Sequence, residues 1–215
     1  MSDALERFLT AAARGEFPPP DGGVTVIGQP AARDAGVLAF TGHSVVFSDE
    51  DPAWIRELLA ATPSDPPAAA MNPVFLAGML ARTGRWMSTV DLLTVAHALP
   101  GRPDVPLREI EDPDHPRVRR ARVYRDGVRV WAADGGTLIL GRGLAGRWEC
   151  AIEVDEGYGG QGLGRALARA ARQLVPDGRV WAQQAPGNAR SVRTFQAAGF
   201  RPVASEALFS LVRPS

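Results

Sequence analysis

The stretch Trp148–Gly164 most constrains what this chain can fold into. Its first seven residues are apolar at alternate positions, which is the period of a half-buried strand. Five glycines follow within the eight positions 157–164, and from Leu163 the apolar residues recur at helical spacing. The sequence therefore predicts a strand, a glycine-rich loop and a helix. Such a loop can hold a phosphate, because glycines let the backbone approach the ligand and the first helical N–H groups point at the anion.

The same glycines also match the dinucleotide-binding fingerprint at Gly157, Gly159 and Gly162. That fingerprint needs an acidic residue about 20 positions later, at the end of the next strand. Asp177 has this spacing but lies in a turn before the strand, and the strand itself ends in Gln183-Gln184. A nucleotide-dependent oxidoreductase is therefore the weaker alternative, because its ribose-binding carboxylate is missing.

A second segment with helix-start and helix-end signals, Pro186–Phe200, follows one strand later. Asn188 suits a helix N-cap, and Gly199 suits the left-handed residue that ends a helix. Together, Y-G-G-Q-G-L-G-R-A-L and P-G-N-A-R-S-V-R-T-F-Q-A-A-G-F resemble motifs of the GCN5-related N-acetyltransferase (GNAT) superfamily. The resemblance covers roughly residues 131–209. It implies a mixed α/β (α+β) fold whose twisted, mostly antiparallel sheet has splayed central strands and flanking helices.

The resemblance also implies which residues would bind the donor, acetyl-CoA. The expected pantetheine contacts are Ile152, Val154 and Asp155, with further contacts at Asn188, Ser191 and Phe195. The expected pyrophosphate loop consists of Gly159, Gly160, Gln161, Gly162, Leu163, Gly164 and Arg165. The family usually has Gln or Arg at the first loop position, so Gly159 removes one side-chain contact to phosphate. Arg165 either replaces that contact or is a solvated residue of the first helical turn.

Acyl transfer to an amine needs a neutral amine and a proton for the leaving thiolate. In the resembling family, a tyrosine on the last helix often serves as the general acid and a glutamate on the preceding strand as the general base. The matching positions here are Phe195 and Gln183, and neither side chain can gain or lose a proton. Glu153 is the predicted base, acting through water, and Tyr158 is the predicted acid. The alternatives are a solvated or arginine-paired Glu153, a packing role for Tyr158, and catalysis by positioning alone.

Composition narrows the remaining function classes. The net charge is zero, with 24 basic and 24 acidic residues, so the overall charge does not favour binding to nucleic acid. Every basic residue is arginine, which indicates GC-rich, bacterial coding.

The single cysteine, Cys150, is expected to be buried. The sequence contains neither a signal-peptide pattern nor an apolar span, which predicts a cytoplasmic protein without membrane contact. The three histidines lack metal-ligand spacing, so no metal is expected.

Two domains are predicted. Residues 1–105 form either an N-terminal extension or a degenerate second GNAT-like half, and residues 106–215 form the acyl-CoA-binding domain. In the first part we expect helices over 3–13, 51–61 and 72–82, strands over 24–27, 36–40, 44–48 and 88–98, and a linker over 62–68. In the second part we expect a helix over 115–124 capped by Asp114, strands over 128–132 and 137–142, and a last strand over 208–212.

These features predict an N-acyltransferase that moves the acyl group of acetyl-CoA to an amine of a small molecule or peptide. The protein would act as a monomer or homodimer. The alternative is an acyl-CoA-binding or sensor module without catalysis, which Phe195 and Gln183 favour. The basic run at 117–122 is expected to be a solvated helix face; a patch for an acidic or nucleic-acid acceptor is the less favoured interpretation.

Overall fold

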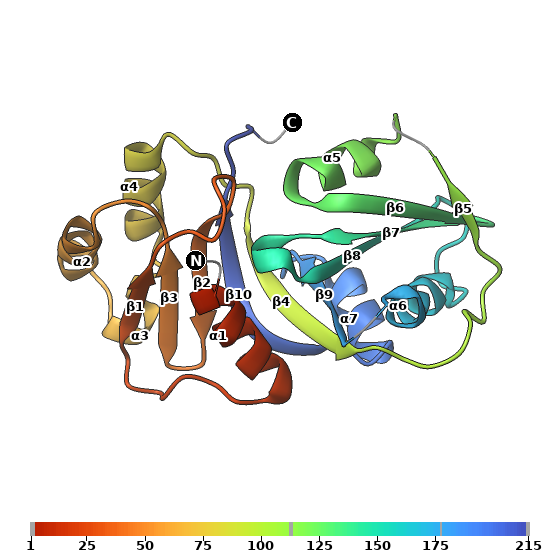
Figure 1. The fold of residues 1–215 in the computed structure, drawn as a ribbon, viewed down its shortest axis with the longest axis horizontal. Coiled ribbons are helices and arrows are strands. Elements are labelled where there is room, and N and C mark those ends of the chain that lie inside the picture. The colour runs from red at the N-terminus through yellow and green to blue at the C-terminus, as the bar shows by residue number, and fades with distance from the viewer. Residues whose placement is uncertain (1–2, 112–113, 177, 214–215) are drawn as a thin grey trace. The chain divides into compact units, whose positions relative to one another are not determined.

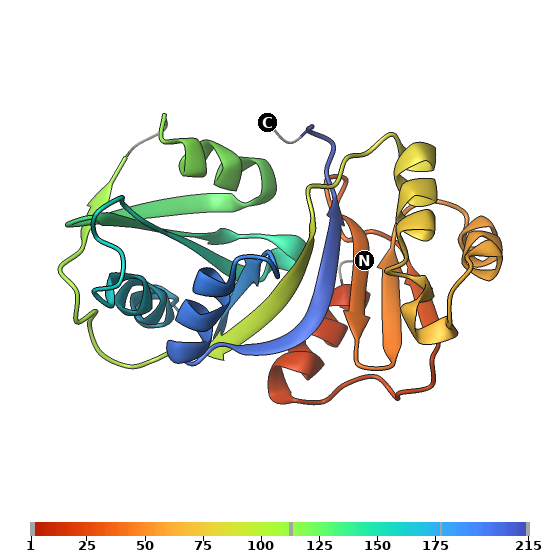
Figure 2. The ribbon, with the colours of Figure 1, turned by 180° about the vertical axis from the view of Figure 1, so that it is seen from behind.

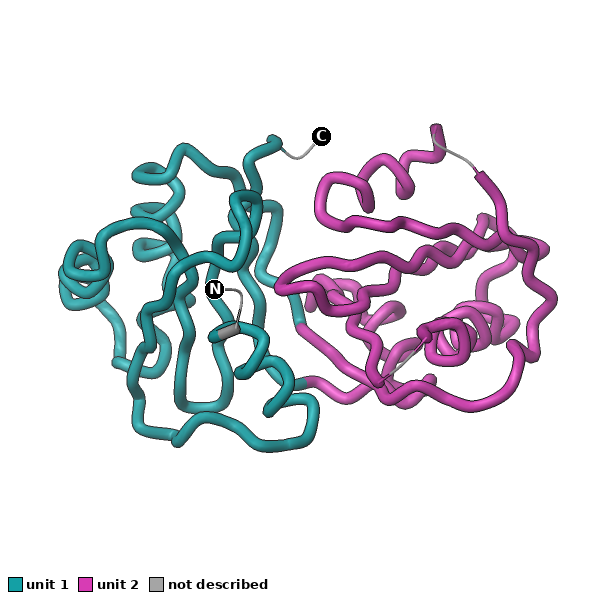
Figure 3. The backbone as a smooth tube through the Cα atoms, in the orientation of Figure 1, with its two compact units in different colours: residues 1–92, 203–215 teal, residues 93–202 magenta. Residues whose placement is uncertain are grey.

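The computed structural model describes residues 3–111, 114–176 and 178–213. The chain divides into two compact units, coloured teal and magenta in Figure 3. Unit 1 comprises residues 1–92 and 203–215, and unit 2 comprises residues 93–202. The sequence placed its boundary at 105/106, whereas the boundary between the compact units falls at 92/93, and the C-terminal strand belongs mainly to unit 1.

In the described part of unit 1, strands pair in the order β1-β3-β2-β10, with β1 parallel to β3 and the other neighbours antiparallel. The strands are β1 (Val24–Ile27), β2 (Ala35–Phe40), β3 (His43–Phe47) and β10 (Arg201–Phe209). The helices are α1 (Asp3–Arg14), α2 (Pro52–Ala61), α3 (Pro66–Ala69) and α4 (Pro73–Thr83) (Figure 1). Asp51 and Asn72 cap α2 and α4, because their side chains accept the N–H groups of Ala53 and Val74.

The two faces of the unit 1 sheet are covered by different helices. On one face, Ile55 of α2 and Phe75 of α4 join Val37 and Val46 in a buried cluster. Phe40 lies an odd number of residues from Val37, so it points to the other face, where the ring of Phe8 in α1 stacks on it.

Unit 2 contains a larger sheet in the order β4-β9-β8-β7-β6-β5 (Figure 2). Its strands are β4 (Val90–His97), β5 (Arg108–Ile110), β6 (Asp126–Ala133), β7 (Gly136–Arg142), β8 (Trp148–Val154) and β9 (Arg179–Gln184). The neighbours from β5 to β8 are antiparallel, and β8 is parallel to β9. The predicted mixed α/β fold with a mostly antiparallel sheet and flanking helices is confirmed.

The helices of unit 2 cover both faces of this sheet. They are α5 (Pro116–Tyr124), α6 (Leu163–Leu174) and α7 (Ala189–Ala197), together with the short 3-10 turn η1 (Leu144–Gly146). Cys150 faces α6 and α7, in a cluster with Leu167 and Phe195, whereas its neighbour Ala151 packs with Val118 of α5. Because side chains alternate along a strand, Glu149 and Glu153 point to the same face as Ala151, which is the α5 face.

Four local predictions were wrong. His115, not Asp114, caps α5: its Nδ1 accepts the N–H of Arg117, and Pro116 occupies the first helical position. The predicted linker over 62–68 contains the start of α3, and β5 was missed because it has only three residues. The last strand spans Arg201–Phe209 rather than 208–212, because it pairs with β2, more than 160 positions earlier.

Gly136 sets how closely α6 approaches β7. A Cβ atom on Gly136 would lie 2.7 Å from the carbonyl oxygen of Glu153 and 3.0 Å from Cδ1 of Leu167 in α6. The carbonyl oxygen belongs to β8 and cannot move without separating β7 from β8, and Leu167 is fully buried against the sheet. The close approach of this helix therefore depends on the missing side chain.

We expect Gly136→Ala to lower the free energy of unfolding by about 1–3 kcal/mol, because the added methyl overpacks the junction. The matched control is Gly187→Ala, since a Cβ atom on the exposed Gly187 would meet nothing within 4 Å; its change should stay within about 0.5 kcal/mol. Urea denaturation of the three proteins measures both values. Equal stability of Gly136→Ala and wild type would contradict the packing account.

Candidate functional site

The glycine-rich loop joins β8 to α6, as the sequence predicted. Gly157, Gly160 and Gly162 have φ values of 91°, 80° and 85°, in the left-handed region that favours glycine. Gly162 is the N-cap residue of α6 and has no side chain with which to cap the first turn. The N–H groups at the start of α6 can therefore donate to a ligand, with the positive end of the helix dipole behind them.

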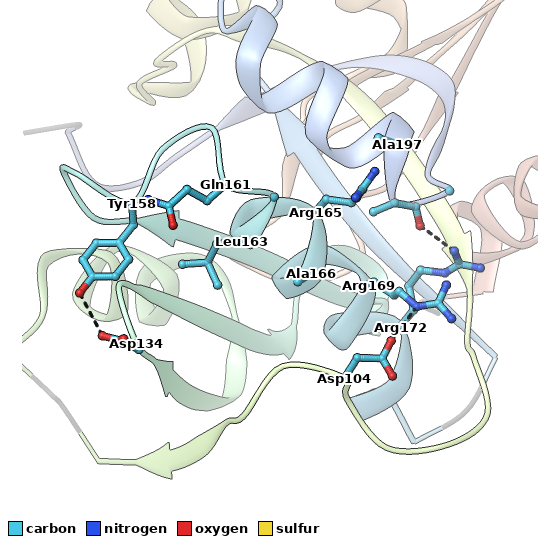
Figure 4. A pocket seen from close by; sticks show the side chains of 13 residues that line it. Asp104, Asp134, Tyr158, Gln161, Leu163, Arg165, Ala166, Arg169, Arg172 and Ala197 are labelled. Carbon is cyan, nitrogen blue, oxygen red and sulfur yellow. Dashed lines mark hydrogen bonds and ion pairs between the residues drawn. The ribbon is translucent and has the colours of Figure 1, made fainter.

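A pocket of about 830 Å³ lies beside this loop, within the size range of small-molecule sites (Figure 4). Its walls are formed by the loop, by the outer face of α6, by residues 197–199 at the end of α7, and by Asp104 and Asp134. Arg169 pairs with Asp104 at 3.4 Å, and Arg172 donates to the carbonyl oxygens of His97 and Ala198. Arg165 lines the same pocket nearer the loop.

The parallel strands β8 and β9 are in register at Glu149 and Trp181. Beyond β9, Pro186 has no N–H to donate to a neighbouring strand. Asn188 then caps α7, since its Oδ1 accepts the N–H of Ser191 at 3.0 Å, and the predicted cap is confirmed. Gly199 has the expected left-handed conformation, with φ of 88°. Pro186 and Asn188 adjoin the C-terminal end of β9, on the edge of β8 opposite to β7.

The predicted pantetheine contacts differ in what they can offer a ligand. The side chains of Ile152 and Val154 pack on the α6 core, so only their backbone groups remain for hydrogen bonding. Asp155 is exposed, and its N–H donates to the carbonyl oxygen of Gly135 at 2.9 Å. Phe195 is buried with its ring edge-on to Phe200, 4.9 Å between centroids, so its side chain belongs to the core.

Glu153, the predicted base, points to the α5 face at the C-terminal end of β8. Its carboxylate accepts from Nε of Arg117 at 2.5 Å, and both side chains remain partly exposed. Of the alternatives set out above, the arginine-paired carboxylate describes this geometry. The exposed side of the pair is reachable from solvent.

Tyr158, the predicted acid, lies over the turn between β6 and β7. A Cβ atom on Gly135 would overlap the tyrosine ring, so the two are in close contact. The Oη group donates to Oδ1 of Asp134 at 3.1 Å. This hydrogen bond and the charge of Asp134 raise the pKa of Tyr158 above its ordinary value. The β6–β7 turn lies on the side of β8 away from β9.

Glu149 is the centre of a buried ionic network that sequence reasoning missed. Its carboxylate accepts from Nε of Arg147 at 2.8 Å and from Nε of Arg125 at 2.9 Å, and also from the N–H of Leu144. Arg125 additionally donates to Oε1 of Gln183 at 3.3 Å. Burial by itself would raise the pKa of Glu149, but the two guanidinium groups lower it to about 2.

Nothing in the sequence marks Arg125 as a partner of Glu149, because it is 24 positions away and lies at the end of α5. One indirect signal is Gly143. A Cβ atom there would lie 2.2 Å from the carboxyl carbon of Glu149, so only glycine lets the carboxylate occupy its position.

Cys150 is buried, as predicted, and burial raises the pKa of its thiol to about 12. Within the described ranges, no three or more His, Cys, Asp or Glu side chains gather where they could hold a metal ion. No helix in the same part of the chain is both long and apolar enough to cross a membrane.

We expect Glu149→Gln to lower the free energy of unfolding at pH 7 by about 3–5 kcal/mol, because it leaves two buried guanidinium groups without a counter-charge. The folded-state pKa of Glu149 lies below its ordinary value of 4.5, so the ionised carboxylate stabilises the fold above pH 4.5. That contribution is lost as the pH falls from 4.5 towards 2. Urea denaturation at pH 7, 4 and 3 should therefore show the gap between wild type and variant narrowing.

The control is Glu109→Gln, which removes one partner of the exposed Glu109–Arg129 pair. It should cost at most about 1 kcal/mol at pH 7. Similar losses for the two variants would contradict the assigned role of Glu149.

Comparisons with known proteins agree with the motifs. Residues 103–200 match the family model described as "Acetyltransferase (GNAT) family". No curated protein matches the chain. Among solved structures, the chain is similar to a GCN5-related N-acetyltransferase from Kribbella flavida, with 19% identity over 67% of this chain and 66% of that one, at a TM-score of 0.42.

Two further structures show similar levels of likeness. An acetyltransferase of the GNAT family from Colwellia psychrerythraea has 7% identity over 82% of this chain and 81% of that one, at a TM-score of 0.40. A GCN5-related N-acetyltransferase from Sphaerobacter thermophilus has 12% identity over 63% of this chain and 55% of that one, at a TM-score of 0.37. The chain thus spans about two thirds of the first structure and just over half of the last. The family model matches residues 103–200, somewhat under half of the chain, and this segment contains both motifs that resemble the GNAT family.

Proposed function

We propose that this chain is an N-acyltransferase that uses acetyl-CoA as donor and transfers the acetyl group to an amine of a small molecule or peptide. One observation carries the proposal. The uncapped start of α6 follows a loop with three positive-φ glycines, beside the parallel pair β8–β9, in a domain of an acetyltransferase family. A diphosphate is the ligand that suits such a helix start.

The donor would bind through backbone groups more than through side chains. In this proposal the N–H groups of residues 159–165 hold the pyrophosphate. The backbone of Ile152, Val154 and Asp155 holds the pantetheine arm, and Asn188 and Ser191 adjoin it from α7. Phe195 does not contact the donor in this proposal; its buried ring packs edge-on against Phe200 and so holds α7 in place.

The reaction follows from that placement. The amine nitrogen attacks the thioester carbonyl carbon, and backbone N–H groups of β8 stabilise the oxyanion that forms. The carbon–sulfur bond then breaks, and the thiolate takes up a proton. Glu153 would accept the amine proton through a water molecule, while Arg117 orients its carboxylate.

A second candidate function is an acyl-CoA-binding module without turnover. Two observations favour it: Phe195 is a buried core residue, and the Oε1 atom of Gln183 accepts from Arg125. Neither residue can transfer a proton. Binding without release of free thiol, over a broad panel of amines, would select this second function.

The donor proposal is tested by calorimetric titration with acetyl-CoA and, separately, with NADH. Wild type should bind acetyl-CoA, and Gly162→Glu should lose that binding, because a carboxylate would occupy the phosphate position. The control Gly146→Glu adds the same charge at another positive-φ glycine with nothing within 4 Å of its Cβ position, before β8; it should bind normally. Binding of NADH in place of acetyl-CoA would favour the dinucleotide interpretation of the loop.

The base proposal is tested by Glu153→Gln, scored as free thiol released from acetyl-CoA with an accepted amine. We expect kcat to fall about 10²- to 10⁴-fold, while the Kd for acetyl-CoA stays unchanged. Tyr158→Phe should change kcat only a few fold, since its hydroxyl donates to Asp134 at the β6–β7 turn. The opposite pattern, with the large loss in Tyr158→Phe, would assign proton transfer to the tyrosine.

A further inference from the structure

The proposed phosphate loop carries little positive charge of its own. Residues 157–164 contain no arginine or lysine, and Asp155 and Glu156 immediately precede them. The diphosphate of acetyl-CoA is an anion, so these carboxylates would oppose its binding at short range. Backbone N–H groups supply only partial charges. Apart from Arg165, which directly follows Gly164, a full positive charge must therefore come from another segment.

Two guanidinium groups reach the loop from its two ends. Nη1 of Arg190, on the first turn of α7, lies 3.6 Å from the position of a Cβ atom on Gly159. Nη2 of Arg165 lies 4.0 Å from the position of a Cβ atom on Gly162. Neither guanidinium group forms a hydrogen bond or an ion pair with another residue in the described parts of the chain. Both are thus available to an anion.

Gly159 differs from Gly157, Gly160 and Gly162 in one respect. Its φ is not positive, unlike those of Gly157, Gly160 and Gly162, so the backbone there does not require glycine. The space that a side chain at position 159 would enter is the space beside which the Arg190 guanidinium lies. A cation is therefore present at this end of the loop, although the loop does not encode it.

We infer that Arg190 binds the diphosphate of the acyl donor and so supplies, from α7, the side-chain contact that Gly159 cannot make. The inference depends on the proposed acyl-CoA site. A guanidinium suits the role because its planar fork can donate two parallel hydrogen bonds to phosphate oxygens. The same contact couples the start of α7, which Asn188 caps, to the loop before α6.

The experiment measures the Kd for acetyl-CoA by calorimetry in four proteins: wild type, Arg190→Ala, Arg119→Ala, and the double variant Arg190→Ala with Gly159→Arg. Arg190→Ala should bind about 10- to 100-fold more weakly, which is the range for hydrogen bonds to charged groups. Arg119→Ala removes the same charge from an exposed position of α5, on the other face of the sheet, and should bind as wild type does. The double variant should recover most of the lost affinity, because Gly159→Arg returns a guanidinium to the same space.

The outcomes separate the two proposals. If wild type does not bind acetyl-CoA, the proposed function and this inference both fail. If wild type binds and Arg190→Ala binds equally well, the inference fails and the proposed function stands. A loss in Arg190→Ala that is matched by Arg119→Ala would show a general effect of net charge and would also overturn the inference. Circular dichroism of each variant checks that the fold is retained.

Discussion

The ion pairs of Glu149 with Arg125 and Arg147 are the interaction on which the rest of unit 2 depends. They join three parts of the chain: the start of β8, the turn before it, and the end of α5. A buried carboxylate is tolerated here because two guanidinium groups and a backbone N–H satisfy it. By fixing the start of β8, this network fixes the strand that leads into the glycine-rich loop, and therefore the place where α6 begins.

The two faces of the unit 2 sheet suit different halves of the proposed reaction. The face covered by α6 and α7 is apolar and ends in the glycine loop, where Arg165 and Arg190 offer positive charge. The face covered by α5 carries the ionisable groups, with Glu149 buried and Glu153 partly exposed beside Arg117. The alternation of side chains along one strand is enough to produce this division.

Local patterns predicted much of this structure. The alternation of apolar residues in Trp148–Val154 predicted β8, the glycines after it predicted the loop, and the helical spacing after Leu163 predicted α6. Each of these patterns depends on a periodicity or a backbone requirement within a few residues. Side-chain pairing was harder to predict. Three contacts join residues that are distant in sequence: Arg125 with Glu149, Arg190 with the space beside Gly159, and β10 with β2. No local pattern encodes such contacts, and the misplaced last strand shows the consequence.

The central claim is that an acyl-CoA diphosphate binds at the start of α6, between the glycine loop and α7. Hydrogen–deuterium exchange of the full chain, with and without acetyl-CoA, tests it most directly, because backbone N–H groups are the proposed ligands. The account predicts slower exchange on ligand addition in residues 159–166 and at the start of α7, around residues 188–192. Unchanged exchange in both segments, with protection appearing only in unit 1, would contradict it.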